Sequence, residues 1–203
     1  MKYVLVSIIA YLTGNIATAY LVSRAFGKID IREHGSGNSG STNVFRILGA
    51  KPAIIVFLGD VLKGTAAVLI GRYLGGSYGE ILAGIFVVAG HNWPIFLGGK
   101  GGKGIATTIG LMLPIDPLMV VLILIVGIIV IITTRYASLA SIVGVTIYPI
   151  AMIITQKPLE YIIFSLVLSS VAIFKHRSNI ERLLKGTESK FGQKKITEQE
   201  GKG

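Results

Sequence analysis

The sequence contains no cysteine and little charge. Because none of its 203 residues is cysteine, disulfide bonds, thiolate nucleophiles and cysteine-ligated metals are excluded. Only 15% of the residues are charged, whereas soluble domains usually reach about 25%. The three histidines are scattered and few carboxylates lie near them, so no metal-ligand set is present. We therefore expect no metal and no cofactor.

Apolar residues, by contrast, are abundant. They make up 52% of the chain, and the mean hydropathy is +0.70, which indicates an integral membrane protein. The run that begins after Lys2 could be mistaken for a signal peptide, but it is long enough to cross a bilayer and we expect it to be retained. Apolar runs lie at about 3–23, 53–74, 80–97, 105–115, 118–134, 138–155 and 159–174.

The distribution of basic residues predicts how the chain crosses the membrane. The run 105–115 is short, since a dozen helical residues span about 18 Å against a hydrocarbon core of about 30 Å. If this run crosses, nearly all lysines and arginines fall on one side of the membrane, as cytoplasmic loops require. We therefore expect an all-α fold of about seven transmembrane helices, one of them short, with the N-terminus outside and the C-terminus cytoplasmic.

This topology also explains the net charge of +10. In a membrane protein, an excess of basic residues indicates cytoplasmic loops rather than nucleic-acid binding, so we expect no nucleic-acid partner. Residues 1–188 should form a single transmembrane domain. The segment 189–203 is polar and lacks apolar periodicity, which predicts a solvated or disordered tail.

Four polar segments should share the cytoplasmic face, namely 34–46, 98–104, 135–141 and 176–181. The first two match the G-x-G-x-x-G pattern, but neither follows a β-strand, so neither is a dinucleotide fingerprint. Successive glycines can still let backbone N–H groups converge on an anion. A flexible connector is the alternative for the first segment. We favour an anion site there, with candidate ligands Ser36, Gly37, Asn38, Ser39, Gly40, Thr42, Asn43 and Arg46.

The second segment ends where the short helix should begin. A helix N-terminus offers unpaired N–H donors and a partial positive charge. The candidates there are Gly99, Lys100, Gly101, Gly102, Lys103 and Gly104. Lys103 is the better of the two lysines because it lies next to the helix start, whereas Lys100 fits a purely topological role as well.

Further candidates come from residues around these segments. His91 lies toward the cytoplasmic end of its span and fits either substrate contact or packing. Asp60 and Lys63, three residues apart within a span, should form a structural ion pair. Ser141 shares a helix face with Ser138, where hydroxyls also serve packing. After the last span come His176, Arg177, Asn179 and Glu181. Binding of this segment to anionic lipid headgroups is the alternative, but it would explain only the arginines.

Three motifs in these segments resemble those of the bacterial acyl-phosphate:glycerol-3-phosphate acyltransferases, the PlsY family. They are Gly35-Ser-Gly-Asn-Ser-Gly-Ser-Thr-Asn-Val-Phe-Arg46, then Gly90-His-Asn-Trp-Pro-Ile-Phe96 with Gly98-Gly-Lys-Gly-Gly-Lys-Gly104, and His176-Arg-Ser-Asn-Ile-Glu-Arg-Leu-Leu-Lys-Gly-Thr-Glu188. The likeness covers all of the chain except the tail. It implies a seven-span enzyme of the bacterial inner membrane, with its active site on the cytoplasmic side.

The resemblance also implies the reaction and its partners. Such an enzyme transfers a fatty acyl group from acyl phosphate to the sn-1 hydroxyl of glycerol 3-phosphate, giving lysophosphatidic acid and phosphate. We expect His176, Lys103, Asn179, Glu181 and His91 to be the catalytic candidates. The identity of the general base stays open. A histidine could take the proton, and Glu181 could orient it in the case of His176. A substrate phosphate could also take the proton itself.

Two other classes of function remain open from the residues alone. A transporter or channel for phosphate or a phosphorylated metabolite would also need cationic loops and a short helix. Its site should lie near the midplane, and its halves should show a repeat, which the sequence lacks. A non-catalytic membrane scaffold would leave the glycine-rich segments unexplained.

Overall fold

The computed structural model describes residues 1–192, and every regular element in that range is helical. The expected all-α class is therefore confirmed. The helices are α1 Lys2–Gly14, α2 Thr18–Gly27, α3 Ser41–Leu48, α4 Ala50–Asn92, α5 Ile105–Met112, α6 Pro117–Thr134, α7 Ala137–Ile154, α8 Leu159–Lys175 and α9 Arg177–Leu184, with short 3₁₀ turns η1 Ile31–Glu33 and η2 Ile95–Leu97.

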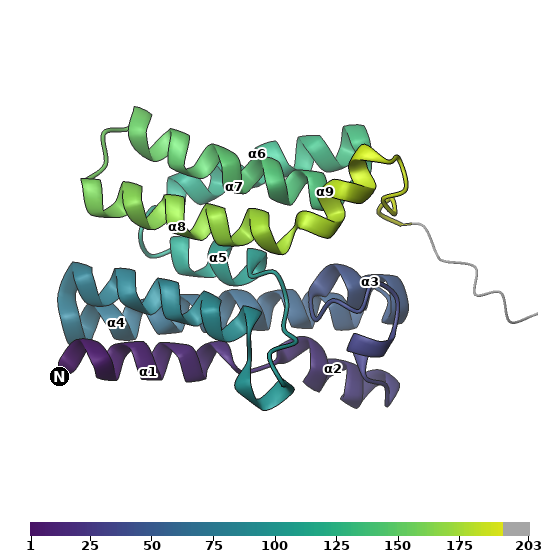
Figure 1. The fold of residues 1–203 in the computed structure, drawn as a ribbon, viewed down its shortest axis with the longest axis horizontal. Helices are drawn as coiled ribbons and strands as arrows, with labels where there is room; N and C mark the ends of the chain where they lie inside the picture. Colours follow the sequence, from purple (N-terminus) through teal and green to yellow (C-terminus); the bar gives the residue numbers. More distant parts are fainter. Residues whose placement is uncertain (193–203) are drawn as a thin grey trace, which may run out of the picture.

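Helix α4 reverses direction in its middle. Gly76 has φ 64° and ψ −152°, a backbone conformation that suits glycine. On either side of it, Arg72 donates to Glu80 at 2.5 Å and the backbone of Gly71 lies against that of Gly79. The element is thus a hairpin with a first arm, 50–75, and a second arm, 77–92, which lie side by side in Figure 1.

Glycines allow neighbouring helices to approach at their backbones. Gly14 of α1 packs on Val87 and Gly90 in the second arm of α4. Gly110 of α5 lies against Val61 in the first arm, where any side chain would meet backbone atoms. Small residues at helix contacts are typical of membrane proteins, because packing rather than the hydrophobic effect holds their helices together.

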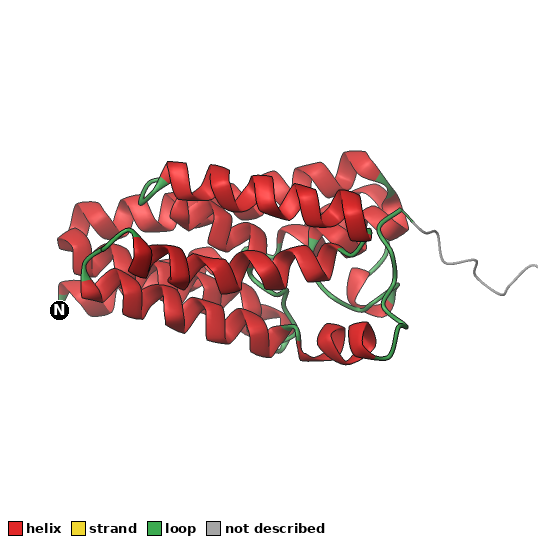
Figure 2. Ribbon diagram, turned by 90° about the horizontal axis from the view of Figure 1, so that it is seen from above, coloured by secondary structure: helices red, strands yellow, loops and turns green. Residues whose placement is uncertain are grey.

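The helices form two layers with the short α5 between them (Figure 1). Helices α6, α7 and α8 make one layer, and α1 to α4 make the other. Seen from above in Figure 2, the longer helices run along a common direction. A cluster of buried apolar side chains joins the layers and includes Val87, Met112, Val120, Tyr148 and Phe164.

The polar segments gather at one end of the bundle. Arg32 donates to the carbonyl of Leu97 at 3.1 Å, and Lys175 donates to the carbonyl of Asn92 at 3.1 Å. Ser138 at the start of α7 donates to Glu188, which follows α9, at 2.8 Å. The four segments that were expected to share the cytoplasmic face thus lie at one end of the bundle, which we call the loop end.

Four helical segments of the described chain are long and apolar enough to cross a membrane, or five if the bent pair α8–α9 counts as one span. One of these segments, Ala50–Leu97, contains both arms of the α4 hairpin. The short α5 was expected to run over 105–115 and ends at Met112.

The chain after Glu188 contacts the loop end through Ser189 and Phe191. Phe191 stacks on Phe45 with ring centroids 4.7 Å apart, and its N–H donates to the carbonyl of Arg135 at 2.6 Å. The carbonyl of Ser189 accepts from Arg46 at 3.3 Å. Residues 190–192 are exposed and residues 193–203 lie outside the described residues, so the solvated tail stays a prediction.

Candidate active site

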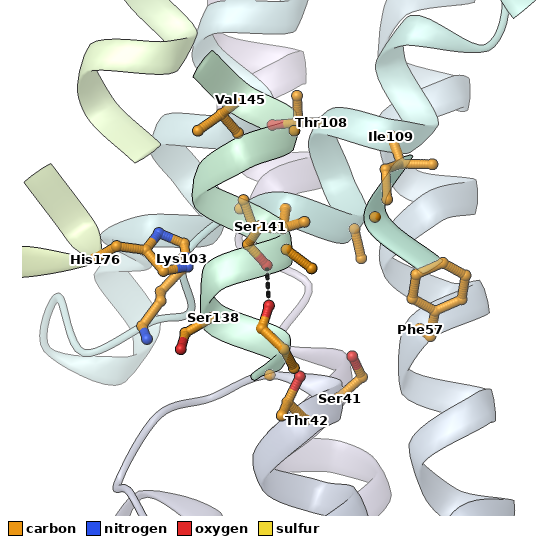
Figure 3. A pocket seen from close by; sticks show the side chains of 18 of the residues that line it. Ser41, Thr42, Phe57, Lys103, Thr108, Ile109, Ser138, Ser141, Val145 and His176 are labelled. Carbon is orange, nitrogen blue, oxygen red and sulfur yellow. Dashed lines mark hydrogen bonds between the residues drawn. The ribbon is translucent and has the colours of Figure 1, made fainter. Parts of the chain in front are cut away.

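A cavity of about 430 Å³ begins at the loop end and continues between α5, α6 and α7. Its outer half is polar, with Ser36, Lys103, Ser141, His176 and Asn179 among its walls, and its inner half is lined mainly by apolar side chains. Figure 3 shows Lys103 and His176 beside Ser138 and Ser141 of α7, with Ser41 and Thr42 of α3 nearby. We call the two halves the polar chamber and the apolar arm.

The first glycine-rich segment is organised by Asn43 at the start of α3. The side-chain amide of Asn43 donates to the carbonyls of Ile31 and His34 at 3.2 and 2.9 Å, and its oxygen accepts from the N–H of Ser36 at 2.9 Å. Both amide hydrogens are therefore used within the loop. Asn43 therefore fixes the shape of the segment, and its role as a substrate ligand stays a prediction.

The N-terminus of α3 forms part of the chamber wall. Ser41 and Thr42 begin this helix and line the cavity together with Asn38 and Gly40. Their N–H groups point out of the first helical turn, where an anion is favoured. Arg46, one turn further, lines the same cavity and brings a full positive charge. This wall is suited to a phosphate group.

The second segment brings Lys103 to the opposite wall. Gly104, with φ 80°, is the N-cap of α5, so the first turn of this helix also faces the chamber. Gly102 packs directly on the ring of His91, and its N–H donates to the His91 carbonyl at 3.2 Å. A side chain at Gly102 would displace the loop that carries Lys103.

A chain of polar contacts connects Lys103 to the C-terminal segment. The ammonium of Lys103 donates to the side-chain oxygen of Asn179, and the amide of Asn179 donates to Glu188 at 2.7 Å. The other carboxylate oxygen of Glu188 accepts from Arg182 at 2.6 Å. Ser138 completes the set by donating to Glu188 at 2.8 Å. One buried carboxylate thus joins α7, α9 and the loop before α5.

This environment shifts the pKa values of its members. Burial lowers the pKa of Lys103 to about 8, helped by the positive charges of Arg182 and Arg46 and opposed by Glu188. Burial alone would raise the pKa of Glu188, but hydrogen bonds from Asn179, Ser138 and Arg182 outweigh it and lower this pKa. Lys103 is therefore charged at neutral pH but close to losing its proton.

His176 lies between α8 and α9 and is only 2% exposed. Its Nδ1 lies 2.7 Å from the carbonyl of Ala172, which can only accept, so Nδ1 carries the proton and Nε2 has the lone pair. Burial and the charge of Lys103 lower the pKa of His176 to about 4. The ring is thus neutral at physiological pH and a weak base.

Beneath the second segment lies a buried ionic network. Asp60 pairs with Lys63 at 2.7 Å, accepts from Thr18 at 2.5 Å and lies 3.4 Å from Nδ1 of His91. Lys63 also donates to the carbonyl of Ile16 at 2.8 Å. The expected Asp60–Lys63 ion pair is present. Asp60 and His91 both reach the cavity wall, and His91 supports Gly102.

Twelve of the twenty predicted site residues line the cavity. They are Ser36, Asn38, Gly40, Thr42, Asn43, Arg46, His91, Lys103, Gly104, Ser141, His176 and Asn179. Ser39, Gly101 and Gly102 pack around His91 in a small adjoining hollow. Gly37, Gly99, Lys100, Arg177 and Glu181 do not line either space.

Three of the residues outside the cavity have identifiable surroundings. Arg177 lies over the ring of Phe174, 4.5 Å from its centroid. The side chain of Glu181 is 64% exposed and pairs with Lys185 at 2.6 Å, four residues on along α9. The expectation that Glu181 orients a histidine is therefore wrong. Lys100 is exposed at the loop surface, as a topological role requires.

Glu188, the last residue of the third motif, is a residue of the site that the motif pattern does not single out. The sequence does contain an indication of its role, because Glu188 is an acidic residue among the basic residues that follow the last span. A carboxylate in such surroundings is expected to pair. Thr108, which also lines the cavity, had no comparable signal.

The fold and the site define a class of protein. A helical membrane protein with a polar chamber for anions, continuous with an apolar arm, is suited to act on a lipid that carries an anionic headgroup. The chain belongs to the glycerol-3-phosphate acyltransferase family, whose model matches residues 4–186. This membership confirms the resemblance drawn from the three motifs.

Individual relatives agree with the family assignment. A glycerol-3-phosphate acyltransferase of Thermoanaerobacter pseudethanolicus is 54% identical over 194 residues, 96% of this chain and 98% of the relative. One of Clostridioides difficile is 48% identical over 200 residues, 96% of this chain and 98% of the relative.

Solved structures show the same fold. The crystal structure of PlsY (YgiH), an integral membrane glycerol 3-phosphate acyltransferase, in its glycerol 3-phosphate form has a TM-score of 0.90 at 36% identity, covering 95% of this chain and 96% of that one. Its lysophosphatidic acid form has a TM-score of 0.87 at 34% identity, with the same coverage.

We predict that Glu188→Ala destabilises the protein and that Glu181→Ala does not. The first change leaves Arg182, Asn179 and Ser138 without their shared acceptor, which should cost about 1–3 kcal/mol. Thermal unfolding in detergent micelles measures this loss as a lower midpoint. Equal midpoints for the two variants would contradict the role of Glu188.

The same experiment has a pH dependence with a defined sign. Because the folded pKa of Glu188 is below its ordinary 4.5, its stabilisation is complete above pH 4.5 and is lost as the pH falls through the folded value. The difference between the wild type and Glu188→Gln should therefore shrink below about pH 4.5.

Proposed function

We propose that this protein transfers a fatty acyl group from acyl phosphate to the sn-1 hydroxyl of glycerol 3-phosphate, giving lysophosphatidic acid and inorganic phosphate. The observation that carries the proposal is one cavity in which a cationic, hydroxyl-rich chamber continues into an apolar arm. The related PlsY structures in glycerol 3-phosphate and lysophosphatidic acid forms support it.

The two halves of the cavity suit the parts of the two substrates. The α3 and α5 N-termini, with Ser36, Thr42 and Gly104, would hold the phosphate of acyl phosphate, and its acyl chain would lie in the apolar arm. Glycerol 3-phosphate would enter the polar chamber, where Arg46 and Lys103 provide positive charge. Ser141, His176 and Asn179 would position its hydroxyls.

The chemistry needs positioning more than a strong nucleophile. The sn-1 hydroxyl oxygen attacks the acyl carbonyl carbon, an ester C–O bond forms, and the bond to phosphate breaks with its electron pair leaving on phosphate. Acyl phosphate is already activated, so the protein contributes mainly orientation and stabilisation of developing charge. Lys103 and the N–H groups of the first turns are placed for that purpose.

The hydroxyl proton passes to the departing phosphate in this proposal. Nε2 of His176 could accept it, but a pKa of about 4 makes this nitrogen a weak base. A phosphate group with a second pKa near 6 is the stronger acceptor within the same chamber. His176 then acts as a hydrogen-bond acceptor that orients the attacking hydroxyl.

We also propose the membrane arrangement. Lys2–Gly27, the two arms of α4, α5, α6, α7 and α8 would make seven crossings, with α5 spanning only part of the bilayer. The excess of basic residues at the loop end supports a cytoplasmic position for it, with the N-terminus outside and the C-terminus inside. The protein would reside in the bacterial inner membrane. No metal or cofactor enters the proposed chemistry.

The transporter alternative is less well supported. A transport site is expected near the midplane with access from both ends. Here Arg46, Lys103 and Glu188, which line the cavity, lie at the loop end. At the opposite end, ion pairs such as Arg72–Glu80 and Lys157–Asp116 tie helices together.

We predict that Lys103→Ala loses at least a hundredfold in activity, because it removes a charge aimed at the reacting groups. The assay follows lysophosphatidic acid by mass spectrometry with palmitoyl phosphate, with and without glycerol 3-phosphate. Lys100→Ala, in the same loop but outside the cavity, is the matched control and should stay within about twofold. Equal losses in both variants would point to the loop's net charge instead.

The activity should also depend on the protonation of Lys103. Lys103 is charged below its pKa of about 8, so kcat/KM for glycerol 3-phosphate should fall as the pH rises through this value. In Lys103→Arg, whose guanidinium stays charged, residual activity should show no fall near pH 8. A fall at the same pH in that variant would assign it to another group.

Topology can be tested because the chain has no cysteine. Tyr73→Cys places a single thiol at the end opposite the loops, where the native side chain is 90% exposed. It should react with a membrane-impermeant maleimide in intact cells, whereas Lys100→Cys should react only after lysis. The reverse pattern would overturn the proposed orientation.

A further inference from the structure

Helix α6 contains a single glycine in an otherwise bulky sequence. Its eighteen residues are almost all Leu, Ile, Val and Met, and Gly127 stands near the middle. Glycine within a helix costs about 0.5–1 kcal/mol relative to alanine. The position therefore needs a reason, and the proposed chemistry at the polar chamber does not supply one.

The missing side chain of Gly127 would point into the apolar arm. A Cβ atom built there meets nothing within 4 Å, and Gly127 itself lines the cavity. Leu124 and Ile131, on the same face of α6, line it as well. Val120, seven residues earlier on this face, is buried in the core, whereas Ile129 on the other side is 54% exposed.

The arm narrows beyond Gly127. Gly144 of α7 differs from Gly127 in this respect. A Cβ atom at Gly144 would lie 3.1 Å from Ile123 of α6, so the two helices are close there. Ile123, Met112 and Tyr148 line this inner end and pack in the central apolar cluster. The arm therefore narrows at this inner end, where α6 and α7 come into contact.

The depth follows from helix geometry. Ala137 and Tyr148 of α7 both line the cavity. Eleven residues of helix separate them, which corresponds to about 16 Å. On α6, Gly127 lies between Ile131, nearer the polar chamber, and Ile123 at the inner end. A chain that enters from the chamber must pass Gly127 to reach this end.

We propose that Gly127 determines the length of the acyl chain that the enzyme accepts. The space left by its absent side chain is occupied by the middle of a long acyl chain, and a larger residue there would stop the chain short of the inner end. This inference rests on the proposed acyl-transfer function and adds its chain-length specificity.

The test is a competition between a long and a short donor. Purified protein in detergent receives equal palmitoyl and octanoyl phosphate with glycerol 3-phosphate, and mass spectrometry measures both lysophosphatidic acids. The product ratio gives the ratio of the two kcat/KM values. Gly127→Leu should lower the palmitoyl-to-octanoyl ratio at least about tenfold, since each methylene excluded from the arm costs about fourfold. Gly127→Ala should lower it about two- to fourfold.

A matched control separates the arm from the rest of the helix. Ile129→Phe adds bulk to the other face of α6 and should leave the ratio unchanged. A ratio within twofold of the wild type in Gly127→Leu overturns the proposal; if this variant is inactive with both donors, an unchanged ratio in Gly127→Ala does so. An equal fall in Ile129→Phe also overturns it. No product from the wild type with either donor would instead overturn the acyl-transfer function itself.

Discussion

The polar chamber depends on how one buried carboxylate is satisfied. Glu188 is 6% exposed, and a carboxylate at that burial is tolerated only when it is paired and hydrogen-bonded. Arg182 supplies the opposite charge, while Ser138 and Asn179 supply hydrogen bonds. Asn179 in turn fixes the ammonium of Lys103. Satisfying Glu188 therefore also positions the ammonium of Lys103 in the polar chamber.

The cavity combines two environments that follow from its position in the bundle. At the loop end, glycine-rich segments and the first turns of α3 and α5 expose backbone donors. Between the helices, the backbone N–H and C=O groups form hydrogen bonds within each helix, so side chains alone determine the polarity of the cavity wall. An amphiphilic substrate fits where the two environments meet. Positioning at that boundary is also what an activated acyl donor requires.

Much of this arrangement could be predicted from the sequence. Apolar runs and the distribution of basic residues placed four polar segments at one end, and the contact of Lys103 with Asn179 agrees with that placement. These features depend on composition and helix periodicity, which are local properties of the chain. The reversal at Gly76 could also be anticipated, since two apolar runs flank Gly75-Gly76-Ser77.

The choice between Glu181 and Glu188 could not be made from spacing. Glu181 lies within α9, where it pairs with Lys185 on the exposed face. Glu188 returns to the site only because the chain turns after α9, with Gly186 at φ 67°. The role of Asn43 was likewise hidden, because its partners Ile31 and His34 depend on the fold of the loop. Such non-local contacts leave no periodic signal.

The stacking of Phe191 on Phe45 has a consequence for biosynthesis. Phe191 and Arg46 both line the cavity, so its wall combines residues from near both ends of the chain. The N-terminal part leaves the ribosome first, and the cavity is complete only after the chain has been synthesised as far as Phe191. A chain released early from translation, or clipped just before Glu188, would insert its helices and still lack a finished site. A complete cavity wall therefore requires nearly full-length synthesis.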